Sequence, residues 1–150
     1  MSSADAVSQL YLDSFGNARL AIISATQLNT AGNAVIAIPL IGGGLTAGIG
    51  TANSGGIIIR RVTVMNPTGT VALANVSITT SNDGNISNAV VGNVVFASVS
   101  GTVKFQDLAI VGGNVAVSGF TTQALYVNVN TASGNANTVD IRVYGDVISF

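Results

Sequence analysis

The sequence predicts an all-β protein, an antiparallel jelly-roll-like sandwich with a short N-terminal arm or helix. Two observations predict this class. Short runs rich in Val, Ile and Thr recur along the chain and are separated by clusters of Gly, Asn, Ser and Thr, which is the pattern of strands and turns. No long segment between these runs has helical periodicity. Because 150 residues is the size of one ordinary domain, a single β-sandwich domain is expected over 17–150.

The amino-terminal arm comprises residues 1–16. Its apolar residues Val7, Leu10, Tyr11 and Phe15 fall at helical spacing. An isolated helix of this length is only marginally stable in water. The spacing therefore predicts either a short helix or an arm that orders against a partner, and these four residues are predicted partner contacts.

Nine strands are expected after the arm, with ends that are uncertain by about 2–4 residues. The glycine-rich stretch 42–56 is expected to be a loop, and "NPTG" at 66–69 and "SNDGN" at 81–85 to be turns. The expected strands are 18–24, 34–41, 57–66, 70–80, 89–97, 102–110, 114–118, 123–130 and 138–149.

The last two strands show the clearest alternation, because successive side chains of a strand point to opposite faces. "TASGNAN" between them predicts a hairpin. The inward rows are Leu125, Val127 and Val129, then Val139, Ile141 and Val143; the outward rows are Tyr126, Asn128 and Asn130, then Asp140, Arg142 and Tyr144.

Two adjacent arginines interrupt the apolar run "IIIRRVTVM". Strand alternation assigns Arg60 and Arg61 to opposite faces, and the more apolar row places Arg60 inward and Arg61 outward. An inward arginine needs a carboxylate partner. The candidates are Asp107, Asp140 and Asp146, and an ion pair of Arg60 with Asp140 is predicted. Arg61 is predicted to contact a partner, because arginine is a frequent interface anchor.

The composition excludes several classes of partner. Hydrophobic residues make up 48% of the chain and charged residues only 7%, with a net charge of −1. Neither nucleic acid nor an anionic membrane is an expected partner, and no unbroken apolar run approaches the roughly 20 residues of a membrane span. So few charges protect a monomer poorly against association, so an obligate oligomer is expected. The first ten residues lack the features of a secretory signal, so cytoplasmic synthesis is expected.

The inventory of reactive side chains argues against an enzyme. The chain contains no His, Cys or Glu, so the common general bases and nucleophile pairs cannot form. The stretch 42–47 matches a loose dinucleotide-binding pattern, but neither a helix nor a suitably placed acid follows it. Residues 82–85 resemble half of a calcium loop, yet they contain one acid, and a type I′ hairpin turn explains them as well. No cofactor and no metal are predicted.

Tyr126 and Tyr144 allow two interpretations. Both point outward by alternation, and exposed aromatic side chains are common in sugar-binding sites. Tyrosine is also enriched at protein interfaces. Because the chain has no Trp and only three Tyr, partner contact is the preferred role of these two residues.

From residue 33 onward the order of phrases resembles small virion proteins of tailed bacteriophages that look like capsid decoration, or cement, proteins. The most specific phrases are "RRVTVMNPTG" and "LYVNVNTASGNANTVDIRVYGD". The resemblance implies a jelly-roll-like subunit, often a homotrimer, seated on the outer surface of an icosahedral head between copies of the major capsid protein. A phage tail or fibre component that contacts the host, or a lectin-like carbohydrate-binding module, remains the alternative.

Overall fold

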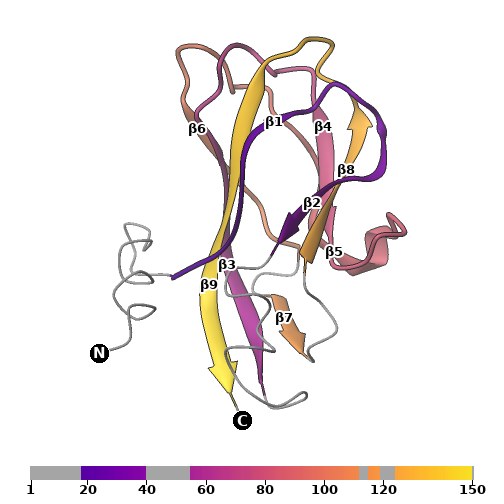
Figure 1. Ribbon diagram of the computed structural model, residues 1–150, viewed down its shortest axis with the longest axis vertical. Helices are drawn as coiled ribbons and strands as arrows, with labels where there is room; N and C mark the ends of the chain where they lie inside the picture. Colours follow the sequence, from indigo (N-terminus) through magenta and orange to yellow (C-terminus); the bar gives the residue numbers. More distant parts are fainter. Residues whose placement is uncertain (1–17, 40–54, 112–114, 119–123, 150) are drawn as a thin grey trace.

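The computed structural model describes residues 18–39, 55–111, 115–118 and 124–149 (Figure 1). This part of the chain is all-β, as predicted, and all nine expected strands are present. They are β1 (Ala18–Gln27), β2 (Gly32–Pro39), β3 (Gly55–Met65), β4 (Asn75–Thr79), β5 (Ala89–Val95), β6 (Phe105–Leu108), β7 (Val115–Ser118), β8 (Ala124–Thr131) and β9 (Thr138–Ser149), with a 3-10 turn η1 (Ile86–Asn88) before β5.

The strands form two antiparallel sheets that lie face to face (Figure 1). Sheet A has the order β1-β9-β3-β6, and β7 pairs with β3 on the same edge as β6 but farther along it. Sheet B has the order β2-β8-β4-β5. This interleaved order is that of a jelly roll, in which most connections pass from one sheet to the other.

The predicted hairpin between the last two strands is wrong. Although β8 and β9 are consecutive, β8 belongs to sheet B and β9 to sheet A, so residues 132–137 cross between the sheets. The crossing is held by other loops: Ser133 N donates to Leu28 O at 2.7 Å, and Asn135 Nδ2 donates to Thr70 O at 3.0 Å. Turn-forming residues indicate that the chain bends, but they do not indicate which sheet receives the next strand.

The 81–85 turn does join two paired strands, β4 and β5, but it is not type I′. A type I′ turn needs positive φ at both central residues. In the described part of this connection only Gly84 has positive φ, +71°. The hairpin instead continues into η1, whose N-cap Asn85 accepts a hydrogen bond from Ser87 N at 3.0 Å.

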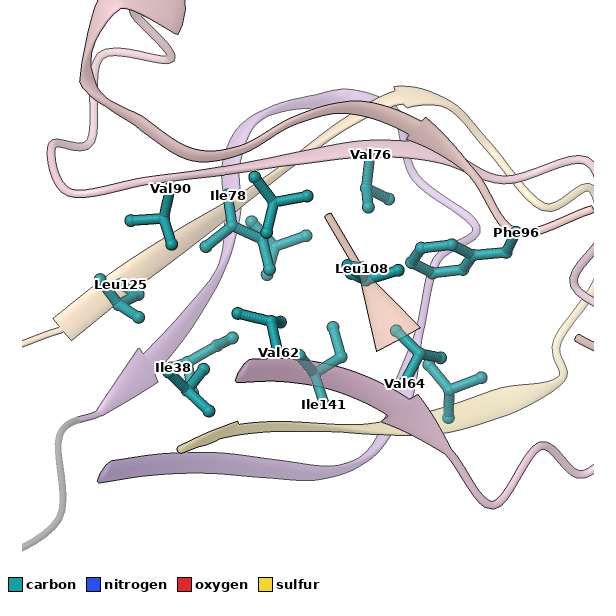
Figure 2. Close-up of a cluster of buried hydrophobic side chains, with 14 of the residues drawn as sticks. Ile38, Val62, Val64, Val76, Ile78, Val90, Phe96, Leu108, Leu125 and Ile141 are labelled. Atoms are coloured by element: carbon teal, nitrogen blue, oxygen red, sulfur yellow. The ribbon is translucent and has the colours of Figure 1, made fainter. Parts of the chain in front are cut away.

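The core lies between the two sheets and is built from Val, Ile and Leu of both (Figure 2). The alternation predicted for β8 and β9 is confirmed there, because every residue of the two inward rows is almost completely buried. Burying one such side chain contributes about 1.5–3 kcal/mol. Figure 2 shows these side chains of the two sheets pointing toward one another: Ile38, Val76, Ile78, Val90 and Leu125 from sheet B, and Val62, Val64, Leu108 and Ile141 from sheet A, with Phe96 beside them.

Candidate functional site

A β-bulge in β3 determines where the two arginines point. Ile59 pairs with Gly145 on β9 and Arg61 pairs with Tyr144, so Arg60 is an extra residue without a direct partner. A bulge of this kind shifts the alternation of the strand by one residue. Ile59 before it and Val62 after it are both fully buried. Both arginines therefore face outward.

The prediction that Arg60 faces inward is therefore wrong. Its basis was strict alternation along β3, which the bulge interrupts. The sequence did contain a signal: the apolar residues change row within the strand, from Ile57 and Ile59 to Val62 and Val64. Such a change of row is what an inserted residue produces.

Each arginine forms an ion pair on the outer face of sheet A. Arg60 Nε lies 2.6 Å from Asp146 Oδ2, and both side chains are about two-fifths exposed. Arg61 donates from Nε and Nη2 to the two carboxylate oxygens of Asp107, at 2.9 and 3.2 Å. Thr63 Oγ1 donates to the same carboxylate at 2.6 Å. The second pair is bidentate and its arginine is only 20% exposed, so it is the better ordered of the two.

The predicted ion pair of Arg60 with Asp140 is wrong, and Asp140 has a different role. One of its oxygens accepts the backbone N–H of Ala25 and the other accepts Asn66 Nδ2, both at 2.8 Å. Both partners have positive φ, +51° and +53°. Because L-residues rarely adopt this conformation, Asp140 holds two tight bends of the backbone.

Strand register brings the basic residues together across sheet A. Arg19, Tyr144 and Arg61 occupy paired positions on β1, β9 and β3, and Arg142 is the outward residue of β9 immediately before Tyr144. We call this surface the charged face. It holds most of the eleven charged residues of the chain: Arg19, Arg60, Arg61, Asp107, Asp140, Arg142 and Asp146.

Arg142 lies at the centre of the charged face, between Ile22 on β1 and Thr63 on β3. Its Nε is buried and has no hydrogen-bond partner among the described residues. Tyr144 is directed outward as predicted but is only 6% exposed. The long side chains of Arg19 and Arg61 flank it in the paired positions, so the ring forms the floor of the face and not an exposed platform.

The outer face of sheet B is different in chemistry. No strand of sheet B contains a charged residue. Asn128, on the outward row of β8, is only 1% exposed. Its Oδ1 accepts Ala34 N at 2.7 Å, and its Nδ2 donates to Ser77 and Thr79 hydroxyls at 3.3 and 3.1 Å. Farther along β8, Asn130 Nδ2 donates to two more amide oxygens, of Asn75 and Asn93.

The predicted site residues are thus only partly brought together. Arg60, Arg61, Asp140 and Tyr144 share the charged face, whereas Tyr126 lies half-buried on the outer face of sheet B. The four arm residues, and the glycine-rich stretch 42–47, lie outside the described part. Sequence reasoning did not select Arg19, Arg142 or Asn128 as site residues; the outward row of β9 already pointed to Arg142.

In residues 82–85, which resemble half of a calcium loop, the carboxylate of Asp83 accepts hydrogen bonds from neighbouring residues. Ser81 Oγ donates to Asp83 Oδ1 at 2.6 Å and Asn85 N donates to the same oxygen at 2.9 Å. These two bonds hold the pKa of Asp83 below its ordinary value. Within the described ranges, no three metal-ligating side chains gather. None of the helical segments described there has the length and apolarity for a membrane span.

Searches with the sequence found neither a matching protein-family model nor a matching curated protein.

Proposed function

We propose that this protein is a structural virion protein that decorates and stabilises an icosahedral phage head. In this role it assembles as a homotrimer on the outer surface of the capsid and binds the major capsid protein. The proposal starts from the resemblance of "RRVTVMNPTG" and "LYVNVNTASGNANTVDIRVYGD" to decoration proteins. The jelly-roll order of the strands is compatible with that family.

The observation that carries the proposal is the gathering of charge on the charged face. Its side chains stand on strands of a sheet, which positions them more rigidly than loops would. Most of its carboxylates are already engaged within the face, whereas Arg142 has no carboxylate partner in the described part of the chain. An acidic group of the capsid protein would form an ion pair with the Arg142 guanidinium, and Arg61 and Tyr144 would flank the contact.

The lectin-like alternative loses its main support. It depended on Tyr126 and Tyr144 acting together on one surface, and the two residues belong to different sheets. A tail or fibre component is equally compatible with a β-rich fold. The number of copies per particle distinguishes it from a decoration protein.

Quantitative mass spectrometry of purified particles tests the location. Hundreds of copies per particle are expected for a decoration protein, and a few copies would instead identify a tail component and overturn the proposal. Binding of recombinant protein to undecorated capsids tests the face. Arg142→Gln is expected to weaken binding at least tenfold.

The matched control is Asn82→Glu, which makes the same change in net charge at an exposed residue of the β4–β5 connection, outside the charged face. Its capsid binding is expected to equal that of the wild type. Equal effects of the two substitutions would show that net charge, and not the charged face, governs attachment.

A further inference from the structure

One long edge of the sandwich is apolar and exposed. It lies where β5 of sheet B and β6 of sheet A end their sheets. Four large apolar side chains on β5, on β6 and in the residues next to them are between about two-fifths and three-fifths exposed. We call this surface the apolar edge; it is formed by Val95, Val103, Phe105 and Val111.

A groove runs along the apolar edge. Residues 105–111 lie antiparallel to β5 and are tied to it at both ends, by Gln106 Nε2 to Val95 O at 3.2 Å and by Val111 N to Val90 O at 2.9 Å. Between these ties the groove has a volume of about 210 Å³ and is lined by Gly92, Asn93, Val94, Ala109, Ile110 and Val111. At about 3.3 Å per residue, the stretch from Val91 to Val95 is about 13 Å long.

The charge on the apolar edge is positive. Lys104, the only lysine of the chain, is exposed between Val103 and Phe105 and has no ion pair within the described residues. The nearby Asp107 is bound to Arg61 on the charged face. A complementary occupant is therefore apolar along one side and acidic.

We propose that the amino-terminal segment of a second copy of this chain binds the apolar edge. Residues 1–16 contain Asp5 and Asp13 and no basic side chain, which complements Lys104. A helix rises 1.5 Å per residue, so the apolar stripe from Val7 to Phe15 would be about 12 Å long, close to the length of the β5 stretch from Val91 to Val95. An amphipathic helix binds an apolar groove through apolar side chains at this spacing.

The segment must come from another copy because its own chain cannot bring the whole stripe to this edge. The segment joins β1 at Ala18, and β1 and β6 are the first and last strands of the order β1-β9-β3-β6. Three strand spacings separate them, about 14 Å. Phe15 is three residues before Ala18, and three residues span at most about 11 Å.

Binding of one copy's segment to another copy's edge is a head-to-tail contact, which forms a ring when the rotation between copies closes, as it does after three copies in a trimer. The inference thus rests on the homotrimer of the proposed function and specifies how it is held together, while it makes no use of the capsid. Loss of trimerisation and loss of capsid binding are separate measurements, so either proposal can fail alone.

Disulfide trapping tests this contact directly, because the chain has no cysteine of its own. The full-length variant Leu10→Cys with Val95→Cys, under mild oxidation, is expected to form covalent oligomers on a non-reducing gel. The control pairs Leu10→Cys with Leu73→Cys, which is 70% exposed but outside the apolar edge, and is expected to stay uncrosslinked. A monomer with an internal disulfide, equal crosslinking in the control, or no crosslinking would overturn the inference.

A charge exchange provides an independent measurement. By analytical ultracentrifugation at micromolar concentration, Lys104→Glu and Asp13→Lys are each expected to weaken trimerisation at least fivefold. Their combination is expected to restore it, because the ion pair is re-formed with its signs reversed. Circular dichroism confirms that each variant keeps its strands. Two single variants with unchanged association, or a combination no better than either, would contradict the ion pair.

Discussion

The two outer faces of this sandwich differ in how their polar side chains are paired. On sheet A, arginines and aspartates pair while partly exposed, as Arg60 does with Asp146. On sheet B, no strand carries a charge, and the amide of Asn128 is buried beneath backbone and hydroxyl partners. Exposed ion pairs contribute little to stability, whereas a buried amide is costly to leave unpaired. The comparison shows that sheet A keeps its charges in partly exposed ion pairs, whereas sheet B buries its polar amide with a complete set of partners.

The start of β2 and the β4–β5 connection lie against the polar side chains of sheet B. Asn33 Nδ2 donates to Asp83 O at 3.4 Å, which links the start of β2 to the β4–β5 connection. Ala34, with φ of +49°, directs its N–H to Asn128. A register shift between Gly32 and Ile36 makes room for this bend in β2. On the charged face, the bulge at Arg60 instead directs an additional charged side chain outward.

The largest expected effect on stability follows from disturbing the bulge of β3 at Arg60. Gly145 faces Ile59 at the bulge, and a Cβ there would collide with the carbonyl oxygen of Ile58. Because the obstacle is backbone, Gly145→Ala is expected to lower the free energy of unfolding by about 3–5 kcal/mol. Gly101→Ala, where a Cβ meets nothing within 4 Å, is the control. Comparable urea midpoints for the two variants would contradict the role of the bulge.

The second effect concerns the buried amide of sheet B. Asn128→Ala leaves Ala34 N and the hydroxyls of Ser77 and Thr79 without this partner, and is expected to cost about 2–3 kcal/mol in urea unfolding. Asn130→Ala, on the same strand but exposed, is expected to cost less than about 1 kcal/mol. Similar losses for both asparagines would mean that burial does not distinguish them.

The two arginines of the charged face are expected to differ modestly, in the order opposite to the one that strict alternation implies. Arg61→Ala breaks a bidentate pair with a half-buried guanidinium and is expected to cost about 1–2 kcal/mol. Arg60→Ala breaks a more exposed pair and is expected to cost less than about 1 kcal/mol. Thermal and urea unfolding of both variants measure this. A greater loss for Arg60→Ala would place that side chain in the interior after all.

The smallest effect is local to the connection that covers sheet B. The pKa of Asp83 is lowered in the folded state, chiefly by the hydroxyl of Ser81. Its contribution to stability is therefore present above the unfolded pKa, about 3.9, and is lost as the pH falls through the lower folded pKa. Ser81→Ala is expected to raise the pKa of Asp83 toward the ordinary value, as followed by NMR titration of its carboxyl carbon. An unchanged titration would assign the shift to the Asn85 N–H instead.

Features that depend on neighbouring residues were predictable. All nine strands were found because β-branched runs and turn residues are local signals, and the inward rows of β8 and β9 followed from alternation alone. Their ends were less certain: the strand expected at 70–80 begins at Asn75, because residues before it form a turn in which Ala74 N donates to Val71 O. The outward direction of the Arg61 side chain was also predicted from the sequence.

The sequence by itself determined that this chain is all-β, contains few charged residues, and lacks the side chains of common catalytic pairs. Composition and a two-residue period are properties of the chain alone. Only the tertiary structure decided that residues 132–137 cross between sheets, that a bulge places both arginines on one face, and that Asn128 is buried. The physical reason is that the face of a side chain depends on its own strand, whereas sheet membership, register and cover depend on which distant segments pack against it.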